Sequence, residues 1–152
     1  MRVLLCAVGR ARKGPERALF EHFTAQLRWP FELREVEERK KLPVSQLQAS
    51  EASLLLRAIP EGAVVVAMDE RGKSLSSRAL ANQVGTWRDD GRDCIAFVIG
   101  GADGLDDTVR KRADLLLSFG KLTWPHILVR GMLAEQLYRC QQILAGHPYH
   151  RD

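Results

Sequence analysis

The residues of this chain that offer the most chemistry stand together in its last six positions, His147-Pro148-Tyr149-His150-Arg151-Asp152. An imidazole can accept or relay a proton near neutral pH, a phenol can stack on a base, and a guanidinium can hold a phosphate. A tail of this kind that folds over a pocket could act on RNA. The alternative is a frayed polar terminus without a function. Its function depends on which elements position the tail and which pocket it could serve.

The composition predicts a single globular domain over residues 1–152. Hydrophobic residues make up 45% of the chain and charged residues 28%, which is ordinary for a domain that buries its own core. No apolar run approaches the ~20 residues of a membrane span. The apolar opening, residues 1–9, is too short for a signal peptide, and no cleavage site follows it. Cys6, Cys94 and Cys140 are odd in number and lie in apolar segments, which predicts buried free thiols and a cytoplasmic protein.

Basic residues cluster in three segments of a chain whose net charge is +4. The clusters are Arg10, Arg12 and Lys13, then Arg39, Lys40 and Lys41, then Arg110, Lys111 and Arg112. Such segments could follow a phosphate backbone. Solvated surface charge explains them equally well.

Strand and helix patterns alternate along the whole chain, which predicts an α/β fold with a mainly parallel sheet. Ser45 and Gln48 form a capping-box pattern at the start of the second helix, and 69–73 is predicted to be a polar turn. Ligands bind at the carboxyl ends of parallel strands, so three loops are candidates, 69–75, 100–105 and 119–126. The expected strands cover 2–9, 31–37, 63–68, 94–99 and 115–119. The expected helices cover 15–28, 45–59, 76–90, 106–112 and 126–145.

Several familiar site patterns are excluded by the residues themselves. Gly72-Lys73-Ser74 is not a phosphate-binding loop, because the required earlier glycine is Ala67. The segment 100–104 fails the dinucleotide-binding pattern, although its glycine pair after a buried strand could let a ligand approach the backbone. No cluster of cysteines or carboxylates joins His147 and His150, and Pro148 between them disfavours a helical metal-binding face, so we expect no metal site. No nucleophilic triad can be placed.

Taken together, the motifs of the chain resemble those of the SPOUT methyltransferases. Val98–Leu105 resembles their glycine loop, Ser118–His126 resembles their second cofactor loop, and 128–139 resembles the helix that follows. The ending Tyr149-His150-Arg151 is typical of one group within them, the RlmH family. Members of that family methylate N3 of a pseudouridine in the helix-69 loop of 23S ribosomal RNA. The resemblance covers the whole chain.

The resemblance implies a SPOUT-type fold with a C-terminal trefoil knot, and a homodimer in which the tail of one subunit approaches the cofactor of the other. It implies 23S rRNA in the assembled ribosome as substrate and S-adenosyl-L-methionine as cofactor. The chain departs from its relatives at Gly120-Lys121, where they often carry small or polar pairs; a grip through the backbone would tolerate this. The implied cofactor-binding residues are Met68, Gly100, Phe119, Gly120, Lys121, Leu122, Thr123 and Trp124.

For this reaction the tail residues receive distinct roles. N3 of pseudouridine carries a proton that must leave, and His150 is the candidate base or proton relay. Tyr149 could stack on the base or bond a carbonyl, and Arg151 could stabilise the developing anion or hold a phosphate. Glu135 and Arg139 are four apart on a helix and could brace one another. His147 and Asp152 receive no direct role.

Plainer interpretations stay open beside these roles. Glu135 and Arg139 could form only a surface ion pair, Tyr149 could only anchor the tail, and water could take the proton. Two rival functions also stay open. One is a methyltransferase of the same fold that acts on tRNA, and the other is a non-enzymatic, ribosome-associated RNA-binding factor.

Overall fold

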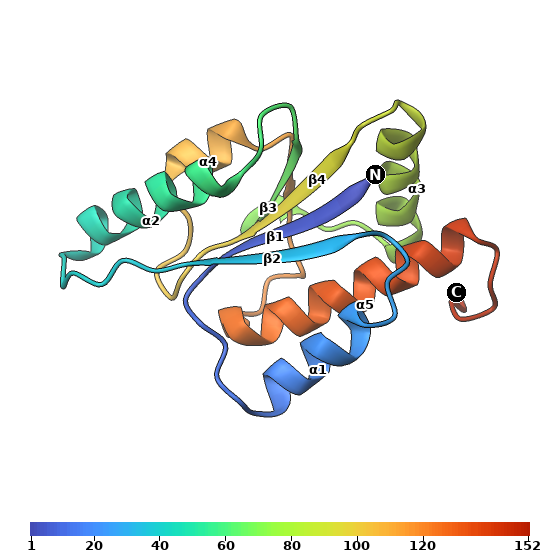
Figure 1. Ribbon diagram of the computed structural model, residues 1–152, viewed down its shortest axis with the longest axis horizontal. Coiled ribbons are helices and arrows are strands. Elements are labelled where there is room, and N and C mark those ends of the chain that lie inside the picture. Colours follow the sequence, from blue (N-terminus) through green and yellow to red (C-terminus); the bar gives the residue numbers. More distant parts are fainter.

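The computed structural model of the protein describes residues 1–152 as ten alternating strands and helices (Figure 1). The five strands are β1 (Arg2–Val8), β2 (Phe31–Val36), β3 (Val64–Lys73), β4 (Cys94–Ile99) and β5 (Leu115–Leu117). The five helices are α1 (Pro15–Thr24), α2 (Val44–Ala58), α3 (Ser77–Asp89), α4 (Asp107–Arg112) and α5 (His126–Leu144). The predicted α/β alternation is confirmed.

The five strands form one sheet in the order β2-β1-β4-β3-β5, and every neighbouring pair is parallel. β1 and β4 lie inside the sheet with helices on both faces. Their side chains are therefore apolar without alternation, as parallel strands that are covered on both sides require. The parallel sheet that the sequence predicts is confirmed.

Alternate residues of the strands point to opposite faces of the sheet and contribute to two separate cores. Leu5 of β1 points into the larger core, where α1, α3 and α5 cover the sheet. Leu4 and Cys6 point into the smaller core under α2 and α4. Figure 1 shows the same layers, with α2 and α4 on one side of the sheet and α1 and α5 on the other. All three cysteines are buried and free, as predicted.

The predicted polar turn at 69–73 is wrong. The chain continues through it as the second half of β3, whose register against β5 shifts between Met68 and Lys73. Gly72 lies so close to β5 that a Cβ there would sit 2.6 Å from the carbonyl carbon of Leu116. The polar residues reflect an exposed extension of the strand beyond β4, where no neighbour covers one side.

Two predicted helix boundaries also differ. α1 ends at Thr24 rather than near Arg28, because the chain continues in tighter turns with hydrogen bonds from Gln26 to Phe23 and from Leu27 to Thr24. α2 begins at Val44 behind Pro43, so Ser45 lies inside the helix and forms no cap. The predicted cap at Ser76 is confirmed, since its hydroxyl accepts from Ala79 N at 3.1 Å.

None of the five helices combines the length and the apolar character that a membrane crossing requires. The trefoil knot that the resemblance implies stays a prediction.

Candidate active site

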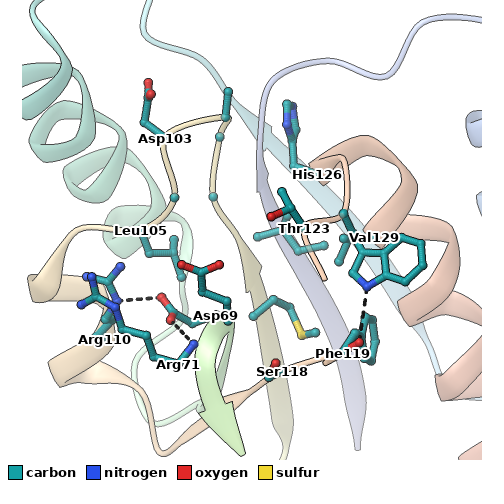
Figure 2. Close-up of a pocket in the computed structure, with 18 of the residues that line it drawn as sticks. Asp69, Arg71, Asp103, Leu105, Arg110, Ser118, Phe119, Thr123, His126 and Val129 are labelled. Carbon is teal, nitrogen blue, oxygen red and sulfur yellow. Dashed lines mark hydrogen bonds and ion pairs between the residues drawn. The ribbon is translucent and has the colours of Figure 1, made fainter. Parts of the chain in front are cut away.

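A cavity of about 560 Å³ opens at the carboxyl ends of β3, β4 and β5. Residues 68–71 of β3 and the loops that follow β4 and β5 form its walls, with His126 and Val129 of α5 completing one side (Figure 2). Parallel strands bring their carboxyl ends to one edge, which is why residues far apart in sequence meet here. Of the eight predicted cofactor-binding residues, seven line the cavity: Met68, Gly100, Phe119, Gly120, Leu122, Thr123 and Trp124. The eighth, Lys121, is exposed and does not line it.

The glycine loop after β4 presents backbone to the cavity because side chains do not fit there. A Cβ on Gly100 would lie 3.0 Å from the carbonyl group of Gly104, and one on Gly101 would lie 3.0 Å from a carboxylate oxygen of Glu51. Gly104 has a φ of +80°, which favours glycine, and its N–H closes a tight turn onto Gly101 O at 3.1 Å. The loop is thus a tight turn and a cavity wall at once.

Helix α2 supports this loop from behind. The side-chain amide of Gln48 donates to the carbonyl of Asp103, and Gln48 itself lines the cavity. Glu51 is buried next to Gly101, and burial, followed by the charges of Asp103 and Glu38, raises the pKa of its carboxyl. The sequence suggested only a capping role for Gln48. Its contact spans 55 residues, so no local pattern could have revealed it.

The loop after β5 supplies an apolar wall. Gly120 has a φ of +106°, and its N–H donates to Ser118 Oγ at 3.1 Å, which turns the chain sharply. Trp124 is held by a hydrogen bond from its Nε1 to Phe119 O at 3.3 Å. Leu122 and Trp124 nevertheless stay exposed, at 72% and 40%. Exposed apolar side chains beside backbone groups suit a flat, partly polar ligand.

The opposite wall is charged (Figure 2). Arg110 of α4 donates to Asp69 at 2.6 Å, and the N–H of Arg71 donates to the other oxygen of Asp69 at 2.8 Å. The Asp69 side chain is only 4% exposed, and Arg110 also reaches Asp107 at 2.8 Å. The sequence placed Asp69 in the candidate loop 69–75 but gave it no role of its own.

His126 is a further residue of the cavity, which the sequence placed in the candidate loop 119–126 but not among the cofactor-binding residues. It begins α5 and lines the cavity next to Val129. Burial, with a smaller contribution from the charge of Arg130, lowers the pKa of its imidazole. Its place right after Trp124-Pro125 in the second loop was the available signal.

The tail packs on its own α5, outside the cavity. Arg139 bonds Glu135 at 3.0 Å through Nε, as predicted, and Tyr149 donates its hydroxyl to Glu135 at 3.0 Å. The guanidinium also lies 4.8 Å over the Tyr149 ring, which packs edge-on against Tyr138. Burial, followed by the Glu135 hydrogen bond, raises the pKa of the Tyr149 phenol. Tyr149 therefore acts here as a neutral donor.

His150 is held on both ring nitrogens. Arg139 lies 3.2 Å from Nδ1, and Asp152 lies 2.9 Å from Nε2. A guanidinium can only donate, so Nδ1 must accept and Nε2 must carry the proton that is given to Asp152. Asp152 is in turn paired with Arg78 of α3 at 2.7 Å. The structure thus assigns Asp152 a contact role that the sequence did not suggest.

A second cavity of about 510 Å³ lies between α1, α3 and α5. Glu135 of the tail cluster lines it, and it shares the segment 117–120 with the first cavity. Tyr149, His150 and Arg151 line neither of the two. The second predicted cofactor loop is therefore a wall between the first cavity and the side on which the tail cluster lies.

The cysteines offer no reactive thiolate. Burial raises the pKa of Cys6 to about 11 and that of Cys140 to about 12. Thiols of this kind stay protonated at neutral pH, and only the thiolate is nucleophilic. No group of three His, Cys, Asp or Glu side chains lies close enough to hold a metal ion.

Comparisons with known proteins cover nearly the full chain. The family described as "Predicted SPOUT methyltransferase" matches residues 1–150. The chain is 64% identical over 151 residues to ribosomal RNA large subunit methyltransferase H of Rhodospirillum centenum, covering 99% of each chain. It is 52% identical to the protein of that name from Rhodospirillum rubrum, covering 100% of each. A solved probable methyltransferase from Bordetella pertussis Tohama I shares the fold, with a TM-score of 0.60 at 14% identity over 91% of this chain and 95% of that one.

Proposed function

The chain belongs to the SPOUT methyltransferase family, among the relatives named ribosomal RNA large subunit methyltransferase H, and we propose that it methylates N3 of a pseudouridine in 23S rRNA. The proposed methyl donor is S-adenosyl-L-methionine, and the proposed target is the helix-69 loop of the assembled ribosome. The observation that carries this proposal is the 64% identity over 99% of both chains to a relative of that name. A ribosomal substrate also implies a cytoplasmic location.

The residues of the first cavity fit S-adenosyl-L-methionine. Its volume of about 560 Å³ lies in the range of small-molecule sites. Gly100 and Gly101 leave their backbone accessible, and Phe119, Leu122 and Trp124 form an apolar wall for a flat ring. Lys121 does not line the cavity, so its departure from the family pattern costs no contact there. When bound, the cofactor supplies a methyl group activated by a sulfonium.

The tail residues supply the remaining chemistry in this proposal. N3 of pseudouridine lies between two carbonyls and attacks only after losing its proton. His150 accepts or relays that proton, for which the contact of Nδ1 with Arg139 must open, since this lone pair is otherwise occupied. Tyr149 stacks on the base or bonds a carbonyl. Arg151, which is exposed, stabilises the anion or holds a phosphate.

We further propose that the protein works as a homodimer in which the tail serves the cofactor cavity of the partner. Two features support this arrangement. The tail cluster is fixed on α5 outside its own cavity, and Glu135 of that cluster faces the second cavity. A second copy that covers the second cavity would place its own loops near this tail.

One rival function differs from this proposal in the RNA that is methylated, and the other in that no RNA is methylated. Relatives named for ribosomal RNA favour that substrate over tRNA. An open cavity lined by the glycine loop favours an enzyme over a factor that only binds RNA.

Mass spectrometry of RNA from a deletion strain tests the function. We expect 23S rRNA from that strain to lack one methyl group on one pseudouridine, and a plasmid copy of the gene to restore it. Calorimetry with the purified protein should show binding of S-adenosyl-L-methionine. Unchanged 23S rRNA together with a lost tRNA methyl group would support the tRNA rival. Unchanged RNA of both kinds would support the non-enzymatic factor.

A further inference from the structure

The loops that follow β1 and β2 lie at the same edge of the sheet as the cofactor cavity. The sheet order β2-β1-β4-β3-β5 brings all carboxyl ends to one edge, so 9–14 and 37–43 extend the row of loops that begins with the glycine loop. Figure 1 shows β1 and β2 running side by side to that edge. Neighbouring strands are about 5 Å apart, so the row from β2 to β3 spans roughly 15 Å.

These two loops carry six exposed cations, which we call the basic strip: Arg10, Arg12, Lys13, Arg39, Lys40 and Lys41. Only Arg10 has a carboxylate within 4.0 Å, Glu37 at 3.5 Å. Glu38, the other acid in these loops, is occupied by Ser50 and by the N–H of Lys40. These loops hold six cations against two carboxylates, Glu37 and Glu38, so most of the positive charge of the basic strip is uncompensated.

The third basic cluster of the sequence is different. Arg110 is bound to Asp69 and Asp107, and Arg112 to Asp114 and to the carbonyl of Ala63. These arginines hold α4 against β3, and carboxylates of the protein itself compensate their charge. The structure thus separates cations that stabilise the fold from cations that are free to bind a polyanion.

The β1 loop of the basic strip is anchored at its base. Arg130 of α5 is 1% exposed and donates to Glu35 at 2.7 Å and to the carbonyls of Val8 and Gly9 at 3.1 and 2.9 Å. Glu35 also accepts from the N–H of Ala11 at 2.8 Å. A buried arginine is costly unless it is paired, so this network ties the loop firmly to α5 and β2. A loop held in this way loses little freedom when it binds.

We propose that the basic strip binds the phosphate backbone of the ribosomal RNA beside the nucleotide that enters the cofactor cavity. This inference rests on the proposed function. The strip lies at the same sheet edge as the cavity, it is exposed, and its charge is complementary to phosphate. Phosphate contacts of this kind position a nucleic acid without reading its sequence.

A pair of charge-matched triple variants tests the basic strip. The strip variant carries Arg39→Gln, Lys40→Gln and Lys41→Gln. The control variant carries Arg28→Gln, Arg57→Gln and Arg92→Gln, three exposed arginines near the amino ends of the strands that have no carboxylate within 4.0 Å. Both variants lose three positive charges. The measurements are methyl transfer to ribosomes, binding of deproteinised 23S rRNA against salt concentration, and binding of S-adenosyl-L-methionine.

We expect the strip variant to bind rRNA about 10- to 100-fold more weakly than the control at 0.1 M salt, with a logarithmic salt slope smaller by about two to three. Its KM for ribosomes should rise similarly, with unchanged cofactor affinity. Equal rRNA affinity and salt slope in the two variants would overturn the inference. Weaker binding of the strip variant to ribosomes but not to deproteinised rRNA would also overturn it, because the strip would then contact a ribosomal protein. Loss of cofactor affinity in the strip variant would also overturn it. Failure of the proposed function is distinct, because the wild-type protein would then transfer no methyl group to rRNA.

Discussion

At the scale of single residues, the environment of His150 decides what the tail can do. Its side chain is 12% exposed and lies between a cation on one nitrogen and a carboxylate on the other. This arrangement selects one neutral tautomer and fixes the ring plane. The imidazole proposed as the base is therefore fixed in orientation, but Arg139 occupies the lone pair of its Nδ1. Movement of Arg139, whose guanidinium also binds Glu135, is the step that would expose Nδ1.

The two histidines of the tail offer a matched comparison. We expect His150→Ala to lower kcat for ribosome methylation by about 100-fold or more, the usual contribution of a general base. His147→Ala should stay within about twofold, because His147 is exposed and its ring only accepts from the N–H of Tyr149 at 3.2 Å. Single-turnover methylation with labelled cofactor measures both, and calorimetry checks that cofactor affinity is unchanged. Equal rates for the two variants would leave proton removal to water.

At the scale of elements, the long strand β3 does more than complete the sheet. Its second half returns to β5 at Lys73, which pairs with Leu117 and whose carbonyl accepts from Ser118 N at 3.0 Å. That contact lies where the second cofactor loop begins. The extension of β3 thus holds the segment 117–120, which forms the wall between the two cavities.

Gly72 is the point where this extension approaches β5, and its replacement tests the role of the pairing. Gly72→Ala would bring a Cβ to 2.6 Å from backbone atoms that cannot move independently. We expect it to lower the free energy of unfolding by about 2–3 kcal/mol. Gly14→Ala is the control, since its Cβ would meet only a flexible Glu16 oxygen at 3.5 Å.

Urea denaturation at a fixed protein concentration measures both glycine variants, because oligomers unfold in a concentration-dependent way. Gly14→Ala should stay within about 1 kcal/mol of the wild type. A Gly72→Ala protein as stable as the Gly14→Ala protein would show that β5 can shift without cost, and that the pairing does not hold the cofactor loop.

At the scale of the whole molecule, the tail and the cavity of one chain face different sides of the segment 117–120. A tail that serves its own cavity would have to leave its contacts with Glu135, Arg139 and Arg78. A tail that serves a partner can keep those with Glu135 and Arg78, and only the contact of His150 Nδ1 with Arg139 has to open. The arrangement of a single chain therefore favours a site completed by two subunits.

Mixing subunits tests this arrangement. His150→Ala impairs the tail, and Thr123→Trp fills the cavity with a bulky ring, so each variant alone should be nearly inactive. In an equal mixture half of the dimers combine one intact tail with the intact cavity of the other chain. We therefore expect recovery to about a quarter of wild-type activity after coexpression, since each mixed dimer has one working site. A mixture no more active than its parts would place the tail over its own cavity.

Elements that local residues determine could be predicted from the sequence, and elements that depend on distant contacts could not. β1 and β4 were predicted well because burial on both faces leaves a continuous apolar run in the sequence. The extension of β3 was missed because a strand that lacks a neighbour on one side carries polar residues like those of a turn. Ser45 was misassigned as a cap because the cap position is Pro43, two residues earlier, and the helix begins at Val44.

By itself, the sequence determined the alternation of strands and helices, the parallel sheet and the loops that must gather at its carboxyl edge. These follow from local periodicity and from the geometry of parallel strands. Only the tertiary structure decided which charges are free. Arg110 meets Asp69 across 41 residues and Arg130 meets Glu35 across 95, while the basic strip keeps most of its charge exposed. Ion pairs form between residues that folding brings together, so no local pattern distinguishes a cation that holds the fold from one available to RNA.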